Sequence, residues 1–67
     1  MSVRGMRVGD TIIGKDMAST YTVVAKSFDK VQARSTDPPH RQKSFSADEL
    51  FCVDADEGLW QQTEDID

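Results

Sequence analysis

Polar and apolar residues alternate along several short segments of this chain, which is the pattern of half-buried β-strands. Met6 and Val8 share one parity, and Val31 and Ala33 alternate with polar neighbours further along. Residues 20–28 are dense in β-branched and aromatic side chains on both faces, which indicates a strongly bent or doubly covered strand. The patterns together predict five strands, at residues 6–14, 20–28, 31–35, 42–45 and 50–53.

Most of the aromatic residues fall on these predicted strands. A chain this small has few other large side chains to fill its interior, so we expect them in the core. They are Tyr21, Phe28, Phe45 and Phe51.

The connections between the strands carry recognisable turn signals. Asp29-Lys30 predicts a tight hairpin, and the two prolines within residues 36–40 predict an open loop, since proline removes a backbone donor and restricts the residue before it. Residues 46–49 have the spacing of a capping box and predict one helical turn, with the Ser46 side chain as its cap. Residues 54–57 repeat that spacing ahead of a candidate short helix, and residues 61–67 are expected to fray.

Length and composition allow one small domain. The chain has 67 residues, of which 37% are hydrophobic, and its single cysteine permits no internal disulfide. We expect an all-β fold, a five-stranded SH3-like barrel over residues 6–53, with an N-terminal extension at 1–5 and an acidic tail at 54–67. No apolar run is long enough for a membrane span or a signal peptide, so we expect a soluble cytoplasmic protein.

The order of short motifs resembles small bacterial SH3-like barrels. The similar families are the KOW-type modules, a small accessory protein of photosystem I and the YodC-like proteins, over residues 6–53. The resemblance implies a barrel fold, and for KOW-type modules it implies contact with nucleic acid. The motifs that carry it are Val8-Gly9-Asp10, Tyr21-Thr22-Val23-Val24, Phe45, Ala47-Asp48-Glu49-Leu50 and Val53.

Charge is distributed unevenly along the chain. The net charge is −4, yet the first 47 residues hold eight basic and four acidic residues, whereas residues 48–67 hold eight acidic residues and no basic one. A basic body with an acidic end can bind an acidic partner through the body, a basic partner through the tail, or fold the tail back on the body.

The acidic tail supplies the first hypothesis, a non-enzymatic module that binds another protein. A tryptophan and a leucine lie among its carboxylates, and tryptophan is a common anchor of protein contacts. Such a segment can also mimic nucleic acid, as expected of a phage-type accessory protein. In the alternative interpretation the tail wraps back and Trp60 covers an open end of the barrel. The candidate partner-binding residues are Asp54, Asp56, Glu57, Leu59 and Trp60.

Two further hypotheses concern the body of the barrel. If the second to fourth strands pair as neighbours, five cations form a basic face that binds nucleic acid, with strong salt dependence. Alternatively, the chain is a structural subunit whose edge strands pair with a larger assembly. The cations of the basic face are Lys26, Lys30, Arg34, Arg41 and Lys43.

The sequence offers little for catalysis or metal binding. His40 and Cys52 are its one histidine and one cysteine, and we expect an exposed loop histidine and a mostly buried cysteine rather than a nucleophilic pair. Residues 54–58 begin like a calcium loop but carry glycine at the wrong position. We therefore expect no enzyme activity, no metal and no cofactor.

Overall fold

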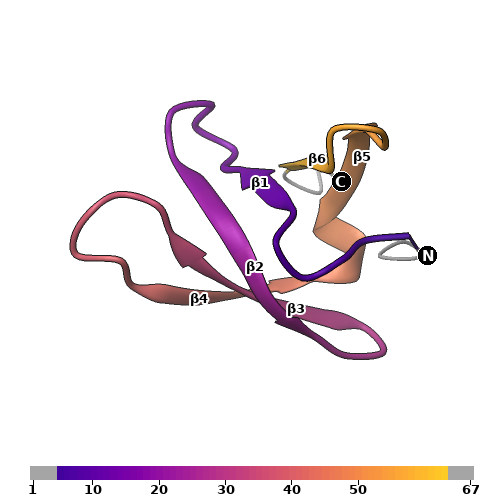
Figure 1. The fold of residues 1–67 in the computed structure, drawn as a ribbon, viewed down its shortest axis with the longest axis horizontal. Coiled ribbons are helices and arrows are strands. Elements are labelled where there is room, and N and C mark those ends of the chain that lie inside the picture. The colour runs from indigo at the N-terminus through magenta and orange to yellow at the C-terminus, as the bar shows by residue number, and fades with distance from the viewer. Residues whose placement is uncertain (1–4, 64–67) are drawn as a thin grey trace.

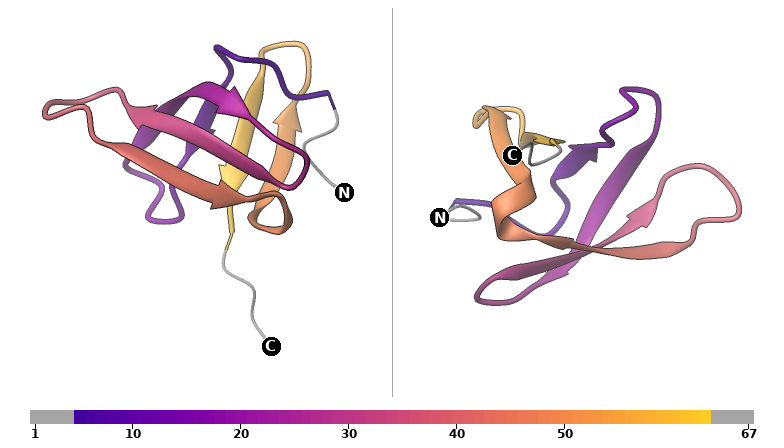
Figure 2. Two further views of the ribbon diagram at one scale, coloured as in Figure 1. Left: turned by 90° about the horizontal axis from the view of Figure 1, so that it is seen from below. Right: turned by 180° about the vertical axis from the view of Figure 1, so that it is seen from behind.

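The computed structural model describes residues 5–63, and these form one curled six-stranded sheet. Spatially the strands run in the order β4-β3-β2-β1-β6-β5, and the sheet curls into a half-barrel (Figures 1 and 2). The all-β prediction is confirmed. Residues 1–4 and 64–67, the outer parts of the expected extension and tail, lie outside the described residues. The elements are β1 (Thr11–Ile13), β2 (Thr20–Lys26), β3 (Lys30–Ser35), β4 (Gln42–Ser46), the 3₁₀ turn η1 (Ala47–Glu49), β5 (Leu50–Asp54) and β6 (Leu59–Gln62).

The sixth strand corrects the prediction of five strands and of a helix after residue 57. β6 pairs in parallel with β1 and antiparallel with β5, so the sheet continues beyond the expected barrel boundary at residue 53. Trp60 and Gln62 are buried while Leu59 and Gln61 are half-buried, which is the period of a strand and not of a helix. Gly58, at φ +68°, reverses the chain before the helix can begin.

The core fills the concave side of the sheet. Half-buried Tyr21 packs against it and meets the Phe45 ring edge-on, with the ring centroids 5.2 Å apart. β2 has a bulge between Val23 and Ala25, which accounts for apolar residues on both of its faces. The buried apolar residues are Met6, Ile12, Val23, Val31, Ala33, Phe45, Ala47, Leu50 and Trp60.

Two of the four aromatic residues expected in the core lie outside it. Phe28 is 97% exposed, because β2 ends at Lys26 and Phe28 stands in the turn that follows. Phe51 is 57% exposed on edge strand β5, where its neighbour Leu50 takes the inward position. The predicted first strand, residues 6–14, is also too long. Val8 is exposed, and only Thr11–Ile13, which form β1, belong to a strand.

The predicted helical turn forms as η1, but without the predicted cap. Ser46 makes no side-chain capping bond. Glu49 instead binds the end of β6: its carbonyl accepts from the Thr63 amide over 2.8 Å, and its Oε1 accepts from Gln62 Nε2 over 3.3 Å. The spacing at residues 54–57 forms a turn in which Asp54 Oδ1 accepts from the amides of Asp56 and Glu57.

Candidate functional site

The five cations of the predicted basic face do not share one face. On β3 and β4, Arg34 pairs with Gln42 and Lys30 pairs with Ser46 on the convex side. Lys43 has the parity of buried Phe45 and belongs to the concave side. The strands pair as neighbours, as expected, but side chains alternate between the two faces, so the single basic face does not form.

The remaining cation on a strand, Lys26, lies beyond the bulge in β2. Beyond it, Lys26 pairs with buried Val31, and its ammonium donates to the carbonyl oxygen of Met6 at the opposite end of β2 from Tyr21. Lys26 is therefore used in holding the N-terminal segment against the sheet.

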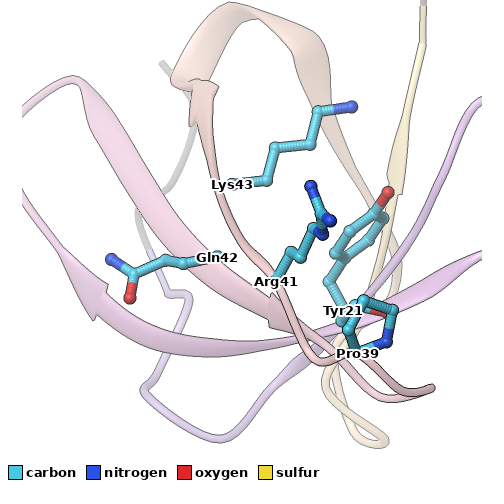
Figure 3. Close-up of a pocket in the computed structure, with 6 residues that line it drawn as sticks. Tyr21, Pro39, Arg41, Gln42 and Lys43 are labelled. Carbon is cyan, nitrogen blue, oxygen red and sulfur yellow. The ribbon is translucent and has the colours of Figure 1, made fainter.

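Two of the cations do converge, beside Tyr21 in a groove of about 360 Å³ (Figure 3). Arg41 and Lys43 reach toward the Tyr21 side of this groove, whereas the Gln42 side chain points away from them. The Lys43 ammonium lies 5.7 Å from the centre of the Tyr21 ring. We call this the Tyr21 groove, and its lining residues are Tyr21, Ser35, Pro39, Arg41, Gln42 and Lys43.

The loop that carries Pro39 and Arg41 is tied to the strands on both sides. The Ser35 amide donates to the Arg41 carbonyl over 2.9 Å, and the Thr36 amide donates to the Thr20 carbonyl over 3.1 Å. His40 has a positive φ of 57°, and its Nδ1 lies 3.0 Å from the Ser35 carbonyl oxygen. These contacts hold the loop that carries Pro39 and Arg41 in place against β2 and β3.

The Tyr21 groove carries positive charge that its surroundings leave unpaired. Within residues 5–63, neither Arg41 nor Lys43 forms an ion pair with a carboxylate. The Lys43 ammonium is held by the rings of Tyr21 and Phe45.

A second surface lies on the convex side of β1, β6 and β5. Phe51 pairs with Gln61, which in turn pairs with Ile13, and these three side chains share one row on that side. Gln61 Nε2 lies 2.8 Å from Met17 Sδ, which places Met17 over the same row. Leu59 occupies the next row. Phe51, Val53 and Met17 are 57%, 54% and 67% exposed.

Carboxylates border this surface at both ends. Asp54 ends β5, Asp56 and Glu57 lie in the turn between β5 and β6, and Asp16 stands beside Met17 at the other end. Asp16 accepts from the backbone amides of Ala18 and Ser19, and these hydrogen bonds hold its pKa below the ordinary value. We call the surface the acid-rimmed face, and it comprises Ile13, Asp16, Met17, Phe51, Val53, Asp54, Asp56, Glu57, Leu59 and Gln61.

Four of the five predicted partner-binding residues lie on the acid-rimmed face, and Trp60 does not. Trp60 is only 4% exposed, so its ring has no surface to offer a partner. Its Nε1 donates to Asp10 Oδ2 over 3.1 Å, and the same oxygen accepts from the Arg7 amide over 2.9 Å. The alternative interpretation, in which the segment folds back and Trp60 covers the barrel, agrees with this position.

Sequence reasoning missed Met17, Phe51 and Val53. The last two belong to a short apolar run that predicts a buried strand. Phe51 has the parity opposite to that of buried Leu50, whereas Val53 stands at the bulge of β5 between Cys52 and Asp54, which the sequence does not signal. The contact of Met17 with Gln61 depends on strand β6 and has no local signal.

His40 and Cys52 are not brought together. His40 precedes β4 and Cys52 lies on β5, at opposite ends of the strand order, and Cys52 is exposed rather than buried because β5 is an edge strand. Among residues 5–63 no cluster of three or more histidine, cysteine or carboxylate side chains is placed to hold a metal ion. No helix in the described part of the chain is long and apolar enough to cross a membrane.

Comparison of the chain with models of protein families, with characterised proteins and with solved structures gives no match.

Proposed function

We propose that this protein is a non-enzymatic protein-binding module, and that its acid-rimmed face binds an apolar segment of a partner flanked by lysine or arginine. The observation that carries the proposal is that Phe51 and Met17, both more than half exposed, lie on either side of Gln61, with exposed Val53 two residues further along β5. Contiguous exposed apolar surface with a polar rim is typical of interaction sites.

Apolar burial supplies the affinity in this proposal. Complete burial of a large apolar side chain contributes about 1.5–3 kcal/mol. Phe51, Val53 and Met17 keep more than half of their surface exposed, so covering all three contributes several kcal/mol before the cost of association. That amount suits a weak, specific contact with a short segment.

The carboxylates determine which charge the partner segment carries. A second copy placed symmetrically on this face would bring Asp16, Asp54, Asp56 and Glu57 against their own counterparts, and like charges across an interface are unfavourable. A segment with basic residues around its apolar side chains meets the rim with opposite charge instead. Nucleic acid suits this face least, because its phosphates carry the same charge as the rim.

A peptide-display selection on the full chain tests this function. We expect the wild-type protein to enrich peptides with adjacent apolar and basic residues, and the paired substitution Phe51→Ser and Val53→Ser to lose that enrichment. Phe28→Ser is the matched control, because it removes an even more exposed aromatic residue outside the face. Equal enrichment by the paired variant, or enrichment of acidic peptides that depends on Phe51, would overturn the proposal.

A further inference from the structure

The Tyr21 groove forms a second site on the opposite part of the sheet, and we infer that it binds an acidic peptide segment, with a carboxylate held by Arg41 and Lys43. This inference does not depend on the acid-rimmed face. The groove lies against β2, β3 and β4, whereas the acid-rimmed face covers β1, β6 and β5.

Charge complementarity identifies the ligand class. Two cations point into a groove of about 360 Å³, and neither has a carboxylate partner in the described part of the chain. The planar guanidinium of Arg41 has the geometry to donate two parallel hydrogen bonds to a carboxylate. Tyr21 and Pro39 add apolar walls, so the segment that fits best has a carboxylate next to an apolar group.

A peptide suits this groove better than nucleic acid does. The Lys43 ammonium lies 5.7 Å from the Tyr21 ring centre and 5.4 Å from that of Phe45, so a cation already occupies the place where a base would stack. Only two of the five cations face the groove, because Lys30 and Arg34 project from the convex side and Lys26 binds Met6. A phosphate backbone would find no continuous track of positive charge.

The conformation of the loop also favours recognition. The bonds that tie Ser35 to Arg41 and Thr36 to Thr20 hold the Pro39 wall in place without a ligand. A preformed groove avoids part of the entropy cost of binding.

The test uses the full chain and a short synthetic peptide of aspartate and glutamate residues around one leucine, followed by NMR titration of backbone amides. We expect shifts at Tyr21 and residues 35–43, and no comparable response to the same peptide with asparagine and glutamine instead. Arg41→Gln should weaken binding about tenfold or more, since it removes hydrogen bonds to a charged group. Arg34→Gln is the matched control, because Arg34 pairs with Gln42 on the convex side, and it should change the affinity less than about twofold.

Three outcomes would overturn the inference. One is equal weakening by Arg34→Gln and Arg41→Gln, which would indicate unspecific attraction. Another is tighter binding of oligo-dT than of the acidic peptide at the same residues. The third is an absence of shifts at Tyr21 and residues 35–43 when the acidic peptide is added to the full chain.

Discussion

The hydrogen bond from Trp60 to Asp10 is expected to be among the strongest single interactions in this small fold. Trp60 is 4% exposed, and its Nε1 donates to a carboxylate oxygen over 3.1 Å. Hydrogen bonds to charged groups contribute about 1.5–3 kcal/mol. We therefore expect Trp60→Phe and Asp10→Ala to show a coupling of about 2 kcal/mol in a double-mutant cycle.

This magnitude is large for the size of the chain. A domain of 67 residues has a total stability of about 3–10 kcal/mol. Loss of about 2 kcal/mol lowers the Tm of such a domain by about 10 °C. Urea unfolding followed by far-UV circular dichroism measures the four proteins of the cycle, because Trp60 is the only tryptophan and its fluorescence disappears in two of them.

The cycle separates the hydrogen bond from the volume lost in Trp60→Phe. That loss, and the loss of the Arg7 amide partner in Asp10→Ala, occur in single and double variants alike and cancel. A control cycle of Trp60→Phe with Asp37→Ala, an exposed loop residue, should show no coupling. A Trp60–Asp10 coupling below about 0.5 kcal/mol would refute the reasoning, since independent sites also add to within that margin.

Three further predictions follow from single residues. Phe28→Ala should change the free energy of unfolding by less than about 0.5 kcal/mol, whereas Phe45→Ala should lower it by about 3–5 kcal/mol. Urea unfolding measures both, and similar effects would contradict the contrast between the exposed Phe28 ring and the buried Phe45 ring. Gly58→Ala should cost at least about 1 kcal/mol, because φ is +68° and a Cβ would lie 2.6 Å from Asp10 Oδ1; an unchanged urea midpoint would contradict this. Asp16 has a lowered pKa, so its contribution to stability is present above its ordinary pKa of 3.8 and is lost as the pH falls through the lower folded value. Asp16→Asn should therefore reduce the loss of stability over that acid range, and an identical pH profile would contradict the role of the two amides.

The alternation of polar and apolar residues along the sequence predicted those strands that have one buried face and one exposed face. β3 is the clearest case, since Val31 and Ala33 are buried between exposed neighbours. β6 was missed because Leu59 and Trp60 are both large and apolar, which is also compatible with a helix, and because its partner β1 is far away in sequence. Phe28 shows the opposite error: its residue type is favourable in strands, but the chain turns before reaching it.

The candidate sites were predictable only in part, because they depend on which strands are neighbours. Asp54, Asp56, Glu57 and Leu59 were identified from the acidic tail and Asp16 was not, and the face that they border required β5 and β6 to pair. Arg41 and Lys43 were identified as cations, yet the groove arises because Lys43 shares its parity with Phe45 while Arg34 does not. Which side chains of β2, β3 and β4 share a side of the sheet depends on the register in which these strands pair. The bulge in β2 shifts that register between Val23 and Ala25.

The sixth strand is what separates the two charged surfaces. β4 and β5 are consecutive in the chain and joined by η1, yet they are the two ends of the strand order. β6 inserts between β1 and β5, so that Leu59 and Phe51 face outward on one part of the sheet while Arg41 and Lys43 stand on the other. Because the two surfaces share no residue, we expect a basic segment and an acidic segment to bind independently, with affinities that each change only when their own surface is altered. A five-stranded barrel that ended at residue 53 would leave β5 without its partner and the acidic turn without a fixed place beside it.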